Sequence, residues 1–200
     1  MKFSSIIFEA ETEGLTSNTS YLTPFLGPRF SNTEVESLIS EYGYSHQFYE
    51  DESKLCRFIA GEIEKGKITG WFQGRAELGA RSLGARSVLA DPRSLSSKAR
   101  LNQLLKRRDW FMPFAPAILE GSENDYLQKY IRSPYMTMAF VATSKAMNDI
   151  PAGIHVDGTC RPNSVSRAQN PRFHRLITEF NRVTGIPAVL NTSFNRHGIP

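Results

Sequence analysis

Positively charged side chains are concentrated in the segment from Gly70 to Trp110, about one fifth of the 200-residue sequence. The segment contains nine lysines and arginines but three carboxylates, an excess of six positive charges, whereas the whole protein has a net charge of +4. Seven of the nine are arginines, whose planar guanidinium groups donate paired hydrogen bonds to phosphate or carboxylate. The pattern favours a site for an anionic ligand over a merely solvated surface.

The sequence Leu-Gly-Ala-Arg-Ser occurs twice in succession in this segment, over residues 78–82 and 83–87. Glycine lets an anion approach main-chain N–H groups, while arginine and serine supply charge and hydroxyl donors. The repeat predicts a phosphate-binding loop whose contributing positions are Gly79, Arg81, Gly84, Arg86 and Ser87. No Gly-Lys-Ser/Thr follows, so it is not a Walker-type loop, and a basic surface loop with a chance repeat is the alternative.

A second basic cluster, Lys106-Arg107-Arg108, stands at the end of a predicted helix. Cations stabilise a helix C-terminus, so a purely structural role is one interpretation. The apolar, proline-containing residues 110–116 follow, and we expect them to shield the cations from water and strengthen their attraction for a phosphate.

Two polar clusters lie nearer the C-terminus. Their residues are His155, Asp157 and Arg161 in the first, and Thr192, Ser193 and Asn195 in the second. The second cluster follows a predicted buried strand, and loops at strand ends commonly bind ligands in open α/β sheets, although a turn without a ligand is the alternative. A His-x-Asp pair lacks a third ligand at a suitable spacing, so the sequence predicts no metal site.

Capped helices are predicted around these clusters. Ser31 and Glu34 have capping-box spacing ahead of a helix that ends at Gly43. A helix over residues 51–65 is expected to bury Leu55, Phe58, Ile59 and Ile63. Another begins at Asn170-Pro171, ends at Gly185, and is expected to bury Phe173, Leu176, Ile177 and Phe180.

The basic segment itself is expected to contain a helix capped by Ser96 or Ser97, with Leu101, Leu104 and Leu105 facing the core. Strands are predicted over residues 68–73, 87–90, 114–119, 135–143 and 187–190. Helices and strands are interleaved without strict alternation, which favours an α/β or α+β domain with a mixed sheet.

The overall composition is that of a globular protein, with 40% hydrophobic and 22% charged residues. No apolar run approaches the length that crosses a bilayer, so we expect no membrane association. Cys56 and Cys160 have no metal-binding spacing, and a disulfide framework is not expected. A reducing cytoplasm is the predicted location.

Six motifs, in order, resemble the C-terminal domain of the carbamoyltransferase family, which includes nodulation protein U and the cephalosporin hydroxymethyl and tobramycin carbamoyltransferases. They are GWFQGRAELGARSLGARSVLADPR, KRRDWFMPFAPAIL, SPYM, IHVDGTCR, NP and GIPAVLNTSFNRHGIP. The resemblance covers residues 26–200, and residues 1–25 are expected to be a linker or the tail of an N-terminal domain. It implies a YrdC-like fold, an open twisted sheet with helices and a basic concave face.

The resemblance also assigns site residues. Lys106 and Arg108 look like the Lys-x-Arg of YrdC-type domains, and Ser193 and Asn195 look like their Ser-x-Asn loop, so these four are expected to contact phosphates. Arg81, Arg86 and Arg161 are expected beside them, with Gly79, Gly84, Ser87, His155, Asp157 and Thr192 in support. Where the family often has proline, this chain has Ala80, which loosens the loop but keeps its glycine and arginine.

The family's chemistry implies that the domain makes carbamoyl-adenylate from ATP and carbamoyl phosphate, with Mg²⁺ arriving on ATP. A separate metal-binding N-terminal domain, in cis or in trans, would then transfer the carbamoyl group to a hydroxyl acceptor. Positioning and charge neutralisation supply most of the rate in such a reaction, so no catalytic residue is assigned. A basic YrdC-like module that binds RNA without catalysis is the alternative, but the aromatic residues do not form an evident stacking platform, which disfavours nucleic acid.

Overall fold

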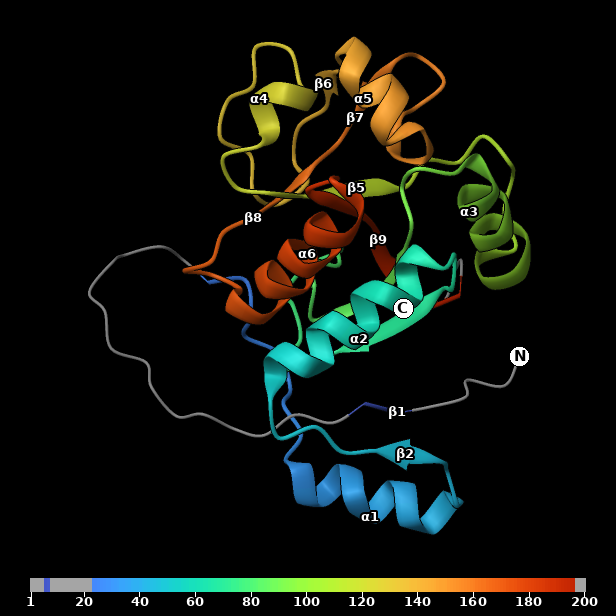
Figure 1. The fold of residues 1–200 in the computed structure, drawn as a ribbon, viewed down its shortest axis with the longest axis vertical. Helices are drawn as coiled ribbons and strands as arrows, with labels where there is room; N and C mark the ends of the chain where they lie inside the picture. The colour runs from blue at the N-terminus through green and yellow to red at the C-terminus, as the bar shows by residue number, and fades with distance from the viewer. Residues whose placement is uncertain (1–5, 8–22, 197–200) are drawn as a thin grey trace.

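The computed structural model describes residues 6–7 and 23–196. Its centre is a five-stranded sheet with the strand order β3-β4-β9-β5-β8 (Figure 1). The strands are β3 (Thr69–Phe72), β4 (Arg86–Ala90), β5 (Ala115–Leu119), β8 (Asn163–Val165) and β9 (Ala188–Ser193). The pairs are antiparallel except β5 with β8, which is parallel. The predicted mixed-sheet α/β fold is confirmed.

Two helices, α2 (Glu52–Glu64) and α6 (Pro171–Thr184), lie side by side and cover one face of this sheet (Figure 1). Their apolar faces share one core with the sheet, and this core includes Ile59, Phe180 and Val189. The predicted buried face of α6 is confirmed at all four positions. In α2 the prediction for Phe58 is wrong: its side chain is exposed and packs on Tyr49 with ring centroids 5.8 Å apart, while the buried face includes Cys56.

The helix boundaries follow from the predicted capping residues. Helix α1 (Asn32–Tyr42) begins with a complete capping box between Ser31 and Glu34, and α6 begins with Asn170 accepting a hydrogen bond from the Phe173 amide. Gly43 and Gly185 end the two helices at φ 62° and 76°. Glycine adopts this left-handed conformation without a Cβ penalty, which is why both helices stop there.

The helix in the basic segment differs from its prediction. Helix α3 (Leu95–Arg100) is capped by Ser94 rather than by Ser96 or Ser97, and it continues as a π-helix over Leu101–Lys106. A π-helix closes hydrogen bonds between residues i and i+5, so its side chains advance differently from those of an α-helix. Leu101 therefore remains buried, Leu105 is partly buried, and Leu104 is exposed.

The strand predicted over residues 135–143 is mostly wrong, because the structure has a strand only at β6 (Phe140–Val141), which pairs with β7 (Thr159–Cys160). This pair lies with the short helices at one end of the molecule (Figure 1). These are α4 (Glu123–Tyr126), α5 (Ser144–Asp149) and the 3-10 turn Pro151–Gly153. At the other end, β1 (Ile6–Ile7) pairs with β2 (His46–Gln47) near α1.

Residues 24–28 run beside residues 76–78, the loop that follows β3, and the two segments are joined by backbone hydrogen bonds. The Leu78 amide donates to the Pro24 carbonyl at 2.6 Å, and the Gly27 amide donates to the Ala76 carbonyl at 2.9 Å. The predicted tail over residues 1–25 lies largely outside the described residues. Across the described part of the chain, no helix has the length and apolar character needed to span a bilayer.

Candidate functional site

An open cavity of about 110 Å³ lies where the loop after β3, the C-terminal half of β9 and the start of β5 meet. Three arginines line it, Arg81, Arg108 and Arg161, together with the hydroxyl-bearing residues Ser82, Thr192 and Ser193. None of the described residues lining this cavity, which we call the arginine cavity, is a carboxylate. Its electrostatic character suits an anion.

Arg161 and Arg81 approach each other across the cavity wall. Burial lowers the pKa of the Arg161 guanidinium, and the nearby charge of Arg81 lowers it further. The Nε of Arg161 is buried and has no hydrogen-bond partner within the described part of the chain. A buried cationic donor without a partner is costly, and an anion in the cavity would offset the repulsion between the two arginines.

Arg108 is held by Asn102, a completely buried residue of the π-helix. Arg108 Nε donates to Asn102 Oδ1 at 2.7 Å, and its Nη2 donates to the Pro113 carbonyl at 2.9 Å. The guanidinium carbon lies 4.4 Å from the centre of the Phe114 ring. The expectation that residues 110–116 shield this cation is met only in part: Pro113 and Phe114 lie against it, whereas Trp110 and Phe111 are exposed. Sequence reasoning missed Asn102, whose only signal was an amide among leucines on a predicted buried helix.

Lys106, Ser193 and Asn195 come together as the resemblance implied, but the ammonium is engaged by protein oxygens. Lys106 Nζ lies 2.6 and 3.1 Å from the carbonyl and Oγ of Ser193, and 2.7 and 3.0 Å from the carbonyl and Oδ1 of Asn195. Burial, and secondarily the charge of Arg108, lowers the pKa of Lys106 to about 8. Three N–H donors are therefore shared among four oxygens, and Lys106 fixes the end of β9 in place.

The glycine loop already contains an anion of its own. Glu77 Oε1 accepts hydrogen bonds from the amides of Leu83, Ala85 and Arg86 at 2.7, 2.8 and 3.3 Å. The main-chain donors expected to hold an external phosphate therefore hold this carboxylate. Sequence reasoning counted Glu77 as a charge opposing the basic cluster and missed its role inside the loop.

Gly84 and Ser87 stabilise the conformation of the loop and do not line the arginine cavity. A Cβ added at Gly84 would lie 2.2 Å from the Phe173 ring, and its φ is 99°, so the position requires glycine for packing against α6. Ser87 is buried, accepts a hydrogen bond from the Gly84 amide at 3.1 Å, and lies within hydrogen-bond distance of Ser82 Oγ. Gly79 has φ 112° and no atom near its Cβ position, so it shapes the turn that precedes Arg81.

Arg86, the second arginine of the repeat, does not line the arginine cavity. Its Nη1 donates to the carbonyls of Gln73 and Ala85 at 2.6 and 3.0 Å. Its Nη2 donates to those of Gly74 and Pro28 at 2.9 and 3.1 Å, and the guanidinium carbon lies 3.6 Å from the Phe72 ring centre. These contacts brace the loop and leave Arg86 outside the site.

His155 and Asp157 lie beside the cavity rather than on its wall. His155 Nδ1 is 3.0 Å from Thr159 Oγ1, and Thr159 donates from its amide and hydroxyl to Asp157 Oδ1 at 3.0 and 2.7 Å. These bonds close the turn that leads to Arg161 and lower the pKa of Asp157, while burial lowers the pKa of His155. Among the described residues no group of three histidines, cysteines or carboxylates could hold a metal ion.

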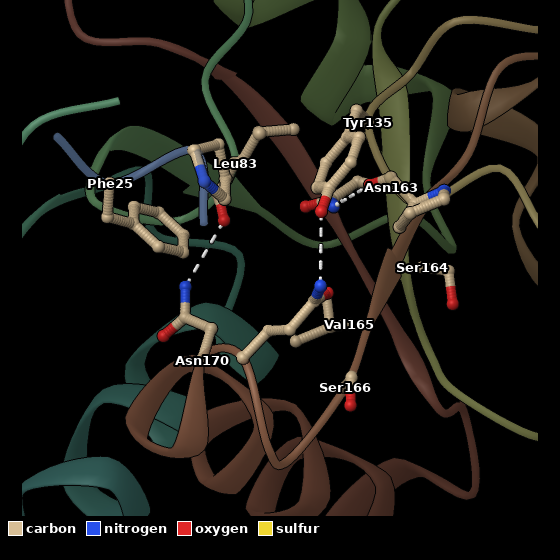
Figure 2. Close-up of a pocket in the computed structure, with 11 residues that line it drawn as sticks. Phe25, Leu83, Tyr135, Asn163, Ser164, Val165, Ser166 and Asn170 are labelled. Atoms are coloured by element: carbon tan, nitrogen blue, oxygen red, sulfur yellow. Dashed lines mark hydrogen bonds between the residues drawn. The ribbon is translucent and has the colours of Figure 1, made fainter. Parts of the chain in front are cut away.

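A second, smaller cavity, of about 20 Å³, lies between residues 24–25, β8 and the start of α6 (Figure 2). Its lining carries no charged side chain. Several of its polar groups satisfy one another: Asn170 Nδ2 donates to the Leu83 carbonyl at 3.2 Å, and Gln169 Nε2 donates to the Tyr135 hydroxyl at 3.1 Å (Figure 2). This cavity offers nothing to balance a phosphate, so the arginine cavity is the candidate site.

Comparison with solved structures supports the fold. P. abyssi Sua5 complexed with L-threonine superposes with a TM-score of 0.51, covering 72% of this chain and 40% of that chain at 15% sequence identity. At this identity the likeness is one of fold, and it agrees with the expected YrdC-like architecture.

Sequence comparison identifies close relatives. An uncharacterized protein of Methanocaldococcus jannaschii is 38% identical over 177 residues, covering 88% of this chain and 29% of the relative. The nodulation protein NolNO of Sinorhizobium fredii is 37% identical over 183 residues, which cover 90% of this chain and 26% of that protein. Nodulation protein U of Rhizobium tropici is 37% identical over 140 residues, which cover 70% of this chain and 24% of that protein. The chain thus spans about a quarter to a third of the length of these relatives. Residues 60–200 match the family described as Carbamoyltransferase C-terminus, and the chain belongs to this family.

Proposed function

We propose that this domain binds ATP and carbamoyl phosphate in the arginine cavity and joins them into carbamoyl-adenylate. The observation that carries the proposal is the convergence of three arginines on a cavity whose lining has no carboxylate, with the buried Nε of Arg161 lacking a partner. Membership of the carbamoyltransferase family supplies the carbamoyl chemistry, and the Sua5-like fold agrees with it.

The proposed reaction balances with one water molecule. Water cleaves the carbamoyl–phosphate linkage, releasing inorganic phosphate, a proton and carbamate. A carbamate oxygen then attacks the α-phosphorus of ATP, forming the new phosphorus–oxygen bond of carbamoyl-adenylate and releasing pyrophosphate. The first step leaves two anions, phosphate and carbamate, in one site, and the second brings carbamate against the phosphates of ATP, so the main requirement is a set of fixed positive charges that neutralises them.

The cavity residues divide this work in the proposal. Arg81 and Arg161 bind phosphate oxygens, and Arg108 binds a further one from a position fixed by Asn102. The hydroxyl of Thr192 donates to the same anions, whereas the hydroxyl of Ser193 donates to Asn195 Oδ1 and shapes the loop. Lys106 and Asn195 act by holding the Ser193 loop in place, and no protein nucleophile is required. Mg²⁺ arrives with ATP and is held by the nucleotide phosphates.

The transfer step belongs to a different part of the protein in this proposal. A metal-binding domain, in cis or in trans, takes carbamoyl-adenylate and passes the carbamoyl group to a hydroxyl acceptor. The relatives matched here are three to four times as long as the part that this chain covers, which leaves room for such a domain. The cytoplasm is the proposed location, because ATP and carbamoyl phosphate are made there.

Calorimetric titration tests the binding step. We expect the 200-residue chain to bind ATP·Mg²⁺ and carbamoyl phosphate, and a short RNA weakly or not at all. Pyrophosphate release from ATP, measured with and without carbamoyl phosphate, tests the chemistry and should require both substrates. Tight RNA binding without nucleotide binding would overturn the enzyme proposal and favour the RNA-binding alternative.

A further inference from the structure

We infer that Trp110 forms a nucleobase subsite at the rim of the arginine cavity, where it stacks on the base of the nucleotide whose phosphates the arginines hold. The inference rests on the proposed function, because it places the non-phosphate part of the same ligand. Phe114, the one aromatic residue among the described residues lining the cavity, is only 2% exposed, so its ring offers little surface to a nucleobase.

The turn that carries Trp110 is anchored at the wall of the cavity. The turn runs from Asp109 to Met112, with the Met112 amide donating to the Asp109 carbonyl at 3.1 Å. The residues on either side of this turn, Arg108 and Pro113, both line the cavity. A turn of this kind brings its ends within about 7 Å of each other, so the backbone of Trp110 is held near two residues of the cavity wall, and an indole at this position can reach the cavity mouth.

The indole is exposed to an unusual degree. Trp110 is 76% exposed, more than any other large hydrophobic residue in the described part of the chain. The neighbouring Phe111 ring is also exposed and meets the indole edge to face, with centroids 6.0 Å apart and an interplanar angle of 90°. Large aromatic side chains normally bury most of their surface, so this exposed pair, carried by a turn between two cavity-lining residues, indicates a binding surface. It corrects the expectation from the sequence that the aromatic residues offer no stacking platform.

Asn102 fixes the spacing between this aromatic surface and the phosphate-binding arginine. Its Oδ1 accepts from Arg108 Nε at 2.7 Å, while its Nδ2 donates to the carbonyls of Trp110 and Met112 at 3.3 and 3.2 Å. One buried amide therefore positions both the cation and the backbone that carries the indole. A nucleotide has the matching arrangement, a polyanion joined at a fixed distance to an aromatic base.

Stacking of a base on an aromatic side chain is largely independent of base identity, since every base has a π-face. The subsite therefore recognises nucleoside triphosphates as a class and distinguishes them from bare polyphosphate. Cations hold the phosphates, and the indole adds affinity only when a base is present.

Calorimetry with two probes separates the subsite from the phosphate site. Trp110→Ala is expected to weaken ATP binding by roughly tenfold or more, while inorganic tripolyphosphate binds as it does to the wild type. Trp110→Phe should recover most of the ATP affinity because it restores an aromatic face. The matched control is Leu95→Ala, which removes another exposed apolar side chain and should change neither titration.

Tryptophan fluorescence gives a second readout. The chain has two tryptophans, so Trp71→Phe leaves Trp110 as the sole emitter, and ATP but not tripolyphosphate should quench it. Wild-type ATP affinity in Trp110→Ala, with tripolyphosphate still bound, would overturn the nucleobase subsite and leave the phosphate site standing. Failure of the wild type to bind either probe would overturn the phosphate site, and the subsite with it. Unchanged ATP binding combined with loss of association with a transferase domain would reassign Trp110 to a protein interface.

Discussion

Arg81 is the arginine of the repeat that faces the proposed ligand, and its loss should reduce binding alone. We expect Arg81→Ala to weaken ATP binding by about 1.5–3 kcal/mol, the usual contribution of a charge-assisted hydrogen bond. Calorimetry measures the change, and Arg167→Ala, which removes an exposed arginine outside the cavity lining, is the control. Equal affinities for the Arg81 variant and the wild type would show that the anion binds elsewhere.

Arg86 should behave in the opposite way, although its sequence context is the same. Its guanidinium donates to four carbonyls and covers the Phe72 ring, so Arg86→Ala should lower the free energy of unfolding by roughly 1–3 kcal/mol. Arg81→Ala should change it by no more than about 0.5 kcal/mol, because its side chain is exposed. Urea denaturation of both variants checks the contrast, which would fail if the two lost equal stability.

The different roles of Arg81 and Arg86 show how far the roles of single residues can be predicted from the sequence. The excess of positive charge predicted an anion site in this segment, and two of its arginines, Arg81 and Arg108, line the cavity. Composition and spacing could not distinguish Arg81 from Arg86, since that depends on which carbonyls the folded loop presents. Glu77 was missed for the same reason: its three amide partners lie six to nine residues away along a loop of no regular structure.

At the scale of elements, the packing of the glycine loop against α6 can be tested by comparing alanine substitutions at two of its glycines. Gly79 and Gly84 both have positive φ, but only Gly84 lacks room for a Cβ, which would meet the Phe173 ring at 2.2 Å. Gly79→Ala should lower the free energy of unfolding by about 1–2 kcal/mol because of backbone strain. Gly84→Ala should lower it by about 1–3 kcal/mol more, because the Phe173 ring must move to make room for the Cβ. Thermal or urea unfolding measures both, and equal losses would contradict the packing argument.

Lys106, the last residue of the π-helix, lies against the end of β9. Its ionisation makes the free energy of unfolding depend on pH, in a direction that can be derived. The pKa of Lys106 is about 8 in the folded protein, below the ordinary value of 10.5. Between these values the unfolded chain holds more protons, so this group makes stability rise as pH increases from about 8, and contributes no slope at lower pH, where both states are charged.

Urea denaturation of the wild type and Lys106→Met at about pH 7.5 and about pH 9.5 isolates this contribution. The stability of the wild type relative to the variant should increase with pH. A difference that stays constant would show that Lys106 keeps its ordinary pKa.

Elements with local signals were the predictable ones. Ser31, Asn170 and the two terminal glycines specify helix ends through contacts within a few residues, and the apolar period of α6 needs no tertiary information. The π-helix was not predictable, because its sequence has ordinary helical spacing and its wider turn is held by tertiary contacts of Asn102 and Lys106. The strands β6 and β7 have two residues each, which is too short for the alternation of apolar and polar residues that marks a strand to appear in the sequence.

At the scale of the whole molecule, the arginine cavity and the Trp110 turn together predict how binding responds to salt. Attraction between cations and a polyphosphate is screened, and the Debye length falls from about 10 Å at 0.1 M to about 3 Å at 1 M ionic strength. Base stacking has no such dependence. Raising the salt from about 0.05 M to about 0.5 M should therefore weaken tripolyphosphate and ATP binding by similar factors, about tenfold or more, and leave the ratio of their affinities nearly constant.

Two variants sharpen this expectation, because they act on different parts of the ligand. Arg81→Ala should reduce the salt dependence of both titrations, since one fewer cation faces the phosphates. Trp110→Ala should keep the wild-type salt dependence while bringing the two affinities together. If instead the preference for ATP over tripolyphosphate disappeared as salt increased, charge alone would account for it. The recognition of nucleotides would then reside entirely in the arginines.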